Sequence, residues 1–574
     1  MKNTKDQFDD LIDNVLEERA DNLPASSIRE ETVKGPFFDK VYSSLIGRGM
    51  KLIEGPRGCG KTHMMRYAWV ECLDDKNKPL PIYVTFNRYY RLEPLLQKKA
   101  NAVDYFHLWV LIRVVISLYE TLDEFENRSL VRSGFKKDFD IDFLMEVVGT
   151  LERGQVLSED EILKTKKISP TYVTNKINNL SSLSGRKRAV LFMDDAALTL
   201  TPEYMHEFFD ILRTFKHEKI SPKASVYPGT TEYGPKFHAD HEAEKISVWL
   251  SPDNESYHDV MRSIAQKRFP EVCKIPESSA SILRYAAFGV PRAYLTMLRE
   301  FMKSEGGNSQ SNINKIIDAH RLGRISEYES LKIKMPKFSS VIDSGMVAIE
   351  VMAKDLATDN IKKFNGNTKQ LIVGVPEGSV GPMASRMFSI LMEAGLLYEY
   401  PAVSHGEDRS YRRFTPHLAL LIANRAFSGG RRGQSHSGIV SFLDRKQEKH
   451  PLRRSLSSLL TEDQLNKLAI DLPPCSHCQA PRVKESQLFC HMCGSELLDV
   501  SSFSVCMSVN LVDVPGLTNW QKERIRDLES LDTVGDLLAN QDPGTELRKI
   551  HRVGEKKAKK IIKLVTVFVD EFLS

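Results

Sequence analysis

Short apolar runs alternate with longer helical stretches along the first half of the chain. Residues 50–54 (MKLIE) predict a short buried strand, and the five apolar residues at 189–193 predict a strand buried on both faces. Residues 221–234 predict a further central strand. Strands separated by helical stretches indicate an α/β core with a parallel sheet.

The most apolar run of the chain lies in a long insertion between two of these strands. Residues 106–119 form this run, which is 14 residues long and contains Arg113. It is too short and too charged for a membrane span, so it predicts a buried helix. We expect the surrounding insertion, residues 100–180, to be mostly helical.

Length and changes in pattern divide the chain into several units. A chain of 574 residues is too long for one hydrophobic core and suggests about three to five domains. The expected units are an N-terminal helical segment (1–33), an α/β core (34–250), a helical lid (251–329), a helix–hairpin unit (330–427), a basic linker (428–470), a cysteine-rich unit (471–500) and an all-α C-terminal unit (501–574).

The composition does not identify a binding partner, but the N-terminal residues and the cysteines bear on the cellular compartment. The hydrophobic content of 41% and charged content of 27% are ordinary, and the net charge of +4 is too small to indicate a partner. The N-terminal residues are acidic and lack an apolar signal core, so we expect a cytoplasmic protein without a membrane segment. Four of the eight cysteines form two CxxC pairs, which favours metal binding over disulfides.

One loop has the spacing of a phosphate-binding loop. Residues 55–62 (GPRGCGKT) fit the pattern G-x-x-x-x-G-K-[ST], with a predicted strand before and a predicted helix after. Glycines let backbone N–H groups surround a phosphate, the lysine reaches the β- and γ-phosphates, and the threonine hydroxyl binds Mg²⁺. The nucleotide-binding residues expected here are Gly55, Pro56, Arg57, Gly58, Cys59, Gly60, Lys61, Thr62 and His63.

Polar residues that could complete this site follow two predicted strands and one turn. Asp194 and Asp195 end the apolar strand, where Asp194 is expected to bind Mg²⁺ and Asp195 to orient the attacking water. Without the loop, the same pair would indicate only an acidic turn. Thr230 or Thr231 could present a hydroxyl to the γ-phosphate, although an ordinary strand–turn fits almost as well. Arg292 begins a predicted helix after GVP, from which its guanidinium could reach the nucleotide.

Together these stretches resemble the AAA+ class, and within it the branch of the origin-recognition-type initiators and STAND switch ATPases. The resemblance covers roughly residues 34–325 and implies that ATP and Mg²⁺ bind between the core and the lid. Asp195 stands where AAA+ motors usually carry glutamate, which retracts the carboxylate by about 1.5 Å. The Asp-Asp pair is similar to the slowly hydrolysing STAND switches, whereas Arg292 is similar to the initiators.

The helix–hairpin unit resembles a winged-helix domain. A helix predicted over 382–394 precedes a strand, a polar loop and a returning strand. In the DNA-binding interpretation the helix and wing contact phosphates and a groove. In the alternative, the unit is a structural lid that packs on the ATPase core. The arginines expected to contact DNA are Arg386, Arg409, Arg412 and Arg413.

The two cysteine pairs have the spacing of a short zinc ribbon. The first pair is Cys475 and Cys478, and the second pair is Cys490 and Cys493. Eleven residues separate Cys478 from Cys490. Two residues between cysteines let both thiolates face one tetrahedral ion, and two such pairs close a structural Zn²⁺ site. A ribbon contacts DNA, RNA or protein equally readily, so it does not identify the partner.

The C-terminal unit contains an imperfect duplication that resembles a tandem helix-hairpin-helix domain. Such hairpins present backbone N–H groups to DNA phosphates. Residues 548–563 hold eight Lys or Arg against one Glu, which favours the second hairpin as the DNA contact. A pair of protein-docking hairpins is the alternative. The residues expected to contact DNA are Gly516, Thr518, Arg552, Gly554, Lys556, Lys557, Lys559 and Lys560.

The sequence therefore favours a DNA-associated AAA+ ATPase that uses ATP to switch conformation or assembly, acting as a homo-oligomer. One rival is a STAND-like switch that licenses an effector, for example in anti-phage defence. Another is a helicase loader or a target selector of the transposition type, in which the ATPase recruits another enzyme to DNA.

Overall fold

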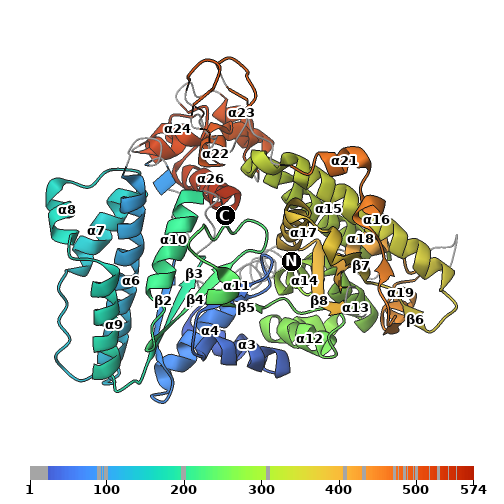
Figure 1. Ribbon diagram of the computed structural model, residues 1–574, viewed down its shortest axis with the longest axis horizontal. Helices are drawn as coiled ribbons and strands as arrows, with labels where there is room; N and C mark the ends of the chain where they lie inside the picture. The colour runs from blue at the N-terminus through green and yellow to red at the C-terminus, as the bar shows by residue number, and fades with distance from the viewer. Residues whose placement is uncertain are drawn as a thin grey trace.

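The computed structural model of the protein brings the core, the lid and the C-terminal unit together around the edge of one sheet (Figure 1). The structure describes residues 23–86, 92–93, 95, 101–195, 202–304, 310–404, 410–428, 435–469, 474–475, 477–482, 487, 489–495, 497, 502–515, 517–526, 531–540, 542–550 and 553–573.

The core contains a parallel sheet of five strands. Its strands are β1 (Lys51–Glu54), β2 (Leu80–Thr85), β3 (Ala189–Asp194), β4 (Ile220–Val226) and β5 (Glu244–Ser247). They lie in the order β2-β3-β4-β1-β5, so β4 separates the strand before the glycine loop from the strand that carries the aspartates. Every residue of β3 and β4 is buried, as expected for central strands covered on both faces. The strands predicted at 50–54 and 189–193 are confirmed.

Helices cover both faces of this sheet. The helices of the core are α2 (Ala25–Glu31), α3 (Pro36–Ile46), α4 (Lys61–Asp74), α6 (Ala102–Asn127), α7 (Ile141–Glu152), α8 (Glu159–Thr165), α9 (Pro170–Leu183), α10 (Pro202–Thr214) and α11 (Ala239–Glu242). Helix α6 is long and apolar enough to cross a membrane, but it packs against β2, α7, α9 and α10. Its side chains belong to the main hydrophobic core, so the prediction of a buried helix is confirmed.

The lid follows the sheet and returns to the glycine loop. It consists of α12 (Tyr257–Arg268), α13 (Glu277–Ala286) and α14 (Pro291–Lys303), followed by the long α15 (Gln310–Lys334). The two helices predicted within 282–301 meet at a turn in which Gly289 has φ of +78°. A Cβ at Gly289 would lie 2.0 Å from the Leu250 carbonyl oxygen, so only glycine fits there. The indole N–H of Trp249 donates to the Phe288 carbonyl at 2.7 Å and fixes the same turn.

A second, smaller sheet belongs to a unit that we call the helix–hairpin module (residues 339–427). Its elements are α16 (Ser339–Lys362), β7 (Val373–Pro376), α17 (Pro382–Glu393), β8 (Leu397–Ser404), β9 (Ser410–Pro416) and α18 (Leu418–Ala423). Strands β7, β9 and β8 are antiparallel neighbours. The helix predicted over 382–394 and the following hairpin are present, and the winged-helix assignment stays a prediction.

Part of the expected linker is folded. Within residues 435–469 the chain forms α19 (His436–Leu443), β10 (Lys446–Gln447), β11 (Leu452–Arg453), α20 (Leu456–Leu459) and α21 (Glu462–Asn466). Strand β11 extends the second sheet beside β7, and Phe442 and Leu443 are buried in the core that the lid and the helix–hairpin module share. The expectation of a linker over 428–470 is therefore wrong for these residues, because its apolar positions pack although its charges suggested solvation.

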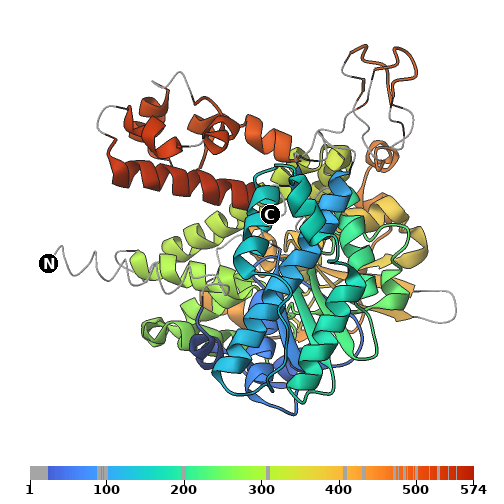
Figure 2. The same ribbon diagram turned by 90° about the vertical axis from the view of Figure 1, so that its left-hand side faces the viewer.

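The C-terminal module (residues 502–573) is helical and folds back toward the α/β core. It contains α22 (Ser502–Ser508), α23 (Asn519–Ile525), α24 (Val534–Ala539), α25 (Pro543–Arg548) and α26 (Glu555–Leu573). Helix α22 packs against α15, and the Lys334 ammonium lies 5.7 Å from the Phe572 ring centroid. Figure 2 shows the module beside the end of the core helices. The helix-hairpin-helix assignment stays a prediction.

Candidate nucleotide-binding site and cysteine cluster

The glycine loop connects the carboxyl end of β1 to the first turn of α4. Strand β1 ends at Glu54 and α4 begins at Lys61, so the loop occupies residues 55–60. Gly58 has φ of +80°, and a Cβ there would lie 2.9 Å from the Arg292 Cβ, which explains why glycine is needed. The N–H groups of the first helical turn lack helical partners and point toward the loop, as an anion site requires.

Lys61 is turned back onto its own loop. Its ammonium donates to the Gly55 carbonyl at 2.6 Å and to the Pro56 carbonyl at 3.4 Å. The same ammonium lies 3.9 Å from the centroid of the Tyr227 ring. Only 7% of Lys61 is exposed, so these contacts replace solvent around the charge.

The aspartates lie at the same edge of the sheet as the loop. Asp194 is 1% exposed, and its carboxylate accepts from the Tyr83 hydroxyl at 2.7 Å. The Asp195 backbone N–H donates to the Asp194 carboxylate at 3.0 Å and to the Ser225 hydroxyl at 2.8 Å. Because β4 lies between β1 and β3, the two strand ends are about 10 Å apart.

These residues fit a nucleotide with its metal. A threonine hydroxyl and a buried carboxylate are the oxygen ligands that Mg²⁺ prefers, and Thr62 and Asp194 supply them from two ends of one sheet edge. Among the described residues, the hydrogen-bond donors to the Asp194 carboxylate are neutral: the Tyr83 hydroxyl and the Asp195 backbone N–H. A cation therefore suits this position.

The threonines predicted to face the γ-phosphate contact other groups. Thr231 accepts the Tyr227 backbone N–H at 3.0 Å. The Thr230 hydroxyl donates at 2.9 Å to the carboxylate of Glu393, the last residue of α17. The side chain beside the loop lysine is instead Tyr227, the first residue after β4. Sequence patterns did not single out Tyr227 or Glu393; the only available signal was the end of the apolar run at Val226.

The lid touches the loop through the start of α14. The Arg292 backbone N–H donates to the Gly58 carbonyl at 3.4 Å, and the Arg292 side chain is exposed. The structure thus brings Arg292 next to the loop, while its role as a nucleotide contact stays a prediction. Arg57 also faces the site, with its guanidinium 5.7 Å from the Tyr227 ring centroid.

His63 faces the N-terminal segment. Its Nε2 lies 2.8 Å from the Thr32 hydroxyl, with which it shares a hydrogen bond. Burial, together with the positive charges of Arg268 and Arg66, lowers the pKa of His63 to about 4. The imidazole is therefore neutral at pH 7.

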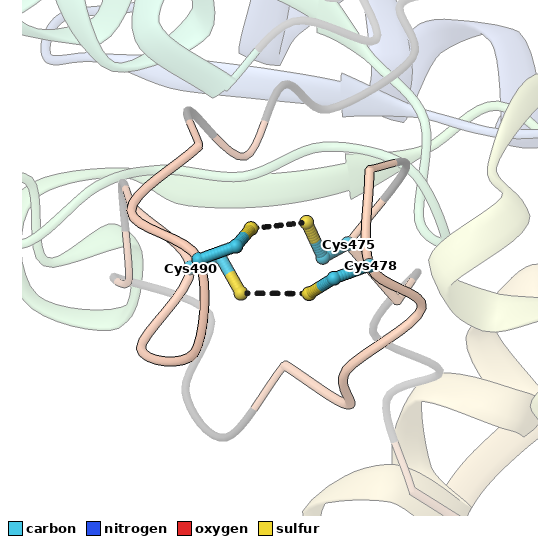
Figure 3. Close-up of side chains that lie close together, drawn as sticks. Cys475, Cys478 and Cys490 are labelled. Atoms are coloured by element: carbon cyan, nitrogen blue, oxygen red, sulfur yellow. Dashed lines mark hydrogen bonds between the residues drawn. The ribbon is translucent and has the colours of Figure 1, made fainter.

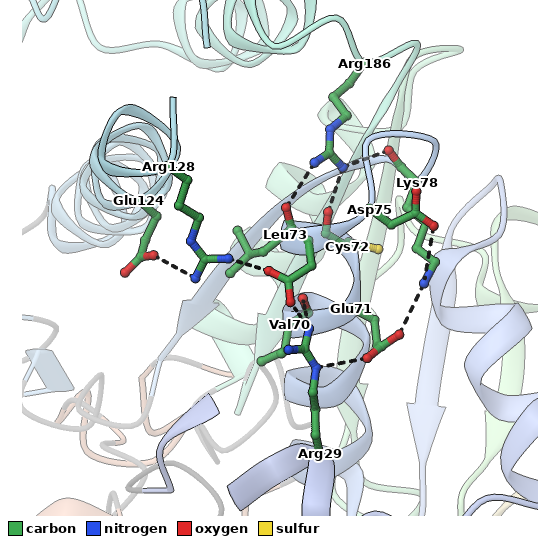
Figure 4. Close-up of polar contacts among 11 residues, drawn as sticks. Arg29, Val70, Glu71, Cys72, Leu73, Asp75, Lys78, Glu124, Arg128 and Arg186 are labelled. Carbon is green, nitrogen blue, oxygen red and sulfur yellow. Dashed lines mark hydrogen bonds and ion pairs between the residues drawn. The ribbon is translucent and has the colours of Figure 1, made fainter. Parts of the chain in front are cut away.

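Arg186 fixes the far end of α4, as Figure 4 shows. Its guanidinium donates to the carbonyls of Cys72 at 2.6 Å, Lys78 at 2.9 Å and Leu73 at 3.2 Å. Burial lowers the pKa of Arg186, but the carbonyls at the helix C-terminus provide the acceptors that a cation needs there. Sequence reasoning missed this residue, because nothing in its neighbourhood in the chain indicates the contact.

The other end of this network also contacts α4. Arg29 of α2 donates to the Glu71 carboxylate at 3.1 Å, and Arg128 forms an ion pair with Asp74 (Figure 4). Helix α4 is thus held by groups from α2, α6 and the segment before β3. This fixes the helix whose opposite end carries Lys61.

The arginines of the helix–hairpin module have intramolecular partners. Arg386 pairs with Glu232 of the core at 3.2 Å. Arg412 binds both oxygens of Glu399 at 2.6 and 3.0 Å, and Arg413 donates to the Pro401 carbonyl at 2.9 Å. Arg409 lies outside the described residues. Helix α17 packs on the core through Ile390, so the α17 residues engaged there are not presented to DNA in this conformation.

The four paired cysteines converge (Figure 3). The sulfurs of Cys475 and Cys493 are 3.5 Å apart, as are those of Cys478 and Cys490, and all four lie within 4.8 Å of one another. Four thiolates about 2.3 Å from one zinc ion need sulfur separations of roughly 3.8 Å. Each pair closes with a backbone bond from the fourth following residue, Gln479 to Cys475 at 2.8 Å and Gly494 to Cys490 at 2.9 Å. The cluster fits a structural Zn²⁺ site.

The C-terminal module presents lysines at the start of its longest helix. Gly554 precedes α26, and Lys556 and Lys560 are exposed. Lys559 pairs with Glu555 at 2.7 Å, and the Lys557 ammonium lies 4.1 Å from the Trp520 ring centroid. Thr518 accepts from the Gln521 N–H and caps α23, whereas Gly516 and Arg552 lie outside the described residues.

Comparisons with known proteins agree with the geometry of the core. Residues 15–193, less than half of the chain, match the family described as ORC-CDC6-like. Twelve solved chains match. One of them, a Walker-type ATPase of Pyrococcus abyssi, is 14% identical, and the match covers 68% of this chain and 94% of that chain. Its TM-score of 0.35 is too low to support a conclusion about the fold or function of this chain. No curated protein matches. The matched segment contains the glycine loop and β3 up to Met193, so it supports an ORC-CDC6-like ATPase core of the AAA+ type.

Proposed function

We propose that the protein is an AAA+ ATPase that binds ATP with Mg²⁺, hydrolyses it slowly to ADP and phosphate, and changes conformation or assembly on DNA. The observation that carries the proposal is the meeting of Lys61, Asp194 and the lid helix α14 at one edge of a parallel sheet. This edge is where ligands bind in open α/β sheets.

Each residue has a chemical role in this proposal. Lys61 stabilises the negative charge of the transferred phosphoryl group, and backbone N–H groups of the loop and of the first turn of α4 hold the phosphates. Thr62 and Asp194 hold Mg²⁺, which neutralises phosphate charge when bound. Asp195 orients water, and Arg292 contacts the γ-phosphate from the lid. The short Asp195 side chain makes slow turnover the expected behaviour, because a misplacement of about 1 Å can cost on the order of 100-fold in rate.

DNA binding is assigned to the C-terminal module. Lys556 and Lys560 are exposed beside the N-terminus of α26, where N–H groups and positive charge together suit a phosphate backbone. The cysteine cluster, holding Zn²⁺, stabilises the ribbon between this module and the core. Homo-oligomerisation in the cytoplasm completes the proposal.

The ATPase rate of the purified protein tests this function. The rate is measured without DNA and with double-stranded, single-stranded and branched DNA, at two salt concentrations. We expect slow turnover that DNA changes and that Lys61→Ala abolishes. If Lys61→Ala leaves the rate unchanged, the site is wrong; if the wild-type rate ignores every DNA at low salt, the DNA assignment is wrong.

One observation favours a second function, a STAND-like switch that licenses an effector. Helix α17 of the helix–hairpin module packs directly against the segment after β4, and Glu393 bonds to Thr230 there. A module docked on the nucleotide site is what a switch closed in one nucleotide state requires. Single-turnover hydrolysis followed by trigger-dependent assembly supports this function, and brisk DNA-stimulated turnover contradicts it.

A further inference from the structure

We infer that residues 227–232, which we call the coupling segment, transmit nucleotide occupancy of the glycine loop to helix α17. Tyr227 contacts the loop lysine at one end of the segment, and Glu393 of α17 accepts hydrogen bonds from Gly229 and Thr230 in its middle. In this inference, phosphate binding at Lys61 displaces the Tyr227 ring and thereby breaks the Glu393 contacts. The inference rests on the proposed nucleotide site and adds a regulatory mechanism to it.

The first step is the environment of the lysine charge. An ammonium group has three N–H donors. In Lys61, the Gly55 and Pro56 carbonyls accept hydrogen bonds, and the Tyr227 ring lies 3.9 Å from the nitrogen. Tyr227 itself is only 7% exposed. Phosphate oxygens need the same ammonium, so the ring and a bound phosphate compete for it.

The second step is the contact between the segment and α17. The Gly229 N–H donates to the Glu393 carboxylate at 3.0 Å, the Thr230 N–H at 2.7 Å, and the Thr230 hydroxyl at 2.9 Å. Consecutive N–H groups that converge on one carboxylate form an anion-binding concavity. A Cβ at Gly229 would lie 2.6 Å from the Ile390 Cα, so the segment and the helix backbone are in close contact.

Further contacts hold the helix in this place. Arg386, two turns earlier on α17, pairs with Glu232 at the end of the coupling segment at 3.2 Å. Gly395, just after the helix, faces the glycine loop, since a Cβ there would lie 3.6 Å from the Pro56 Cβ. The carboxyl half of α17 therefore contacts the coupling segment, and the residue two positions after the helix lies beside the loop.

The third step is the stiffness of the segment. The Tyr227 N–H donates to the Thr231 hydroxyl at 3.0 Å, and the Thr231 N–H donates to the Tyr227 carbonyl at 3.4 Å. These two bonds close a five-residue turn around Gly229 and Thr230. Both bonds are made by the Tyr227 backbone, so a displacement of Tyr227 that shifts its backbone also shifts the donors that hold Glu393. Phosphate binding at Lys61 therefore competes both with the Tyr227–Lys61 contact and with the hydrogen bonds to Glu393.

The buried position of Glu393 disfavours its negative charge in the docked state. Burial raises the pKa of Glu393, while hydrogen bonds from Thr230 and the charge of Arg57 lower it again. Removing the donors leaves a carboxylate in a site that disfavours charge, so α17 is expected to leave the site with them.

Hydrogen–deuterium exchange on the full chain tests the inference, with and without ATPγS and Mg²⁺. In wild type we expect nucleotide to raise exchange of α17 peptides at least ~5-fold. In Glu393→Gln, α17 exchanges quickly even without nucleotide, and ATPγS binds ~3–10-fold more tightly because no docked state must be opened. Glu350→Gln, an exposed position on α16, is the matched control and behaves as wild type.

Variants of Tyr227 separate coupling from stability. Tyr227→Phe keeps the ring beside the ammonium and should keep the exchange response. Tyr227→Ala should bind nucleotide while α17 stays protected, because nothing links the two sites. Thermal unfolding of each variant confirms that it is folded.

The possible failures are distinguishable. If wild type binds ATPγS and α17 exchange does not change, the coupling is wrong and the proposed function survives. If wild type binds no ATPγS and equals Lys61→Ala, the proposed function itself is wrong. If Glu393→Gln leaves both α17 exchange and affinity at wild-type values, Glu393 is not the contact that nucleotide breaks.

Discussion

Two modules of the protein carry clusters of basic side chains, which are paired within the chain in one module and exposed in the other. In the helix–hairpin module, Arg386 pairs with the core and Arg412 pairs with Glu399. In the C-terminal module, Lys556 and Lys560 are exposed at the start of α26. The comparison teaches that a cluster of basic residues in the sequence does not show which of their charges the folded chain pairs internally and which it leaves exposed.

The chemistry of the side chains explains the difference. A guanidinium is planar and matches both oxygens of a carboxylate, as Arg412 does with Glu399, and its weak hydration favours half-buried pairs. An ammonium is compact and strongly hydrated, and Lys556 and Lys560 at the start of α26 remain exposed to solvent. The arginines of the helix–hairpin module are therefore paired within the chain, whereas Lys556 and Lys560 of the C-terminal module are exposed.

The largest expected effect concerns the four-cysteine cluster that precedes the C-terminal module in the sequence. Replacing Cys475 with Ser, or removing metal with a chelator, should unfold the turns that carry the four cysteines, because structural zinc contributes on the order of 10 kcal/mol to such small sites. Stoichiometric zinc analysis and limited proteolysis measure the change. Cys273→Ser, an exposed cysteine outside the cluster, is the control. Full zinc content in Cys475→Ser would contradict the site.

The next effect tests the nucleotide site that we propose to release the docked helix–hairpin module. Lys61→Ala should weaken ATP binding by ~100-fold or more, since charged hydrogen bonds contribute about 1.5–3 kcal/mol each. Titration with a fluorescent ATP analogue measures it. Lys76→Ala, beyond the far end of α4, serves as the control and should bind as wild type.

A smaller effect compares the two modules directly. The double substitution Lys556→Gln and Lys560→Gln should weaken DNA binding roughly 10-fold and reduce the salt slope by about 2, because each lysine that leaves a phosphate removes one released counterion. Fluorescence anisotropy at several salt concentrations measures both quantities. Arg412→Gln in the helix–hairpin module should change affinity less than ~2-fold. Equal losses in both variants would contradict the comparison.

The smallest effect concerns His63, a half-buried imidazole that is neutral at pH 7. Its folded pKa of about 4 lies below the unfolded value, so the unfolded chain binds more protons as pH falls below about 6.5. The free energy of unfolding should drop by roughly 1 kcal/mol between pH 7 and 5.5 from this group alone. Urea unfolding of wild type and His63→Gln measures the difference. In the variant, the free energy of unfolding should fall by roughly 1 kcal/mol less over this pH range. Identical pH profiles for the two proteins would contradict the lowered pKa of His63.

The sequence by itself determined the local features of the protein. The strands at 50–54 and 189–193, the glycine loop that starts α4, and the cysteine spacing all follow from a few consecutive residues. Hydrophobic runs select strands, glycine permits the positive φ of the loop, and two-residue spacing turns thiolates toward one point. Features of this kind need no knowledge of the rest of the chain.

Only the tertiary structure decided which distant groups meet. Thr230 and Glu393 are 163 residues apart, and Arg186 reaches α4 carbonyls more than 100 residues earlier. Packing of α17 on the core also gave Arg386 its carboxylate and left Tyr227, not a threonine, beside Lys61. Such contacts depend on how whole elements pack, because hydrophobic burial fixes the elements first and polar side chains then pair with whatever packing brings near.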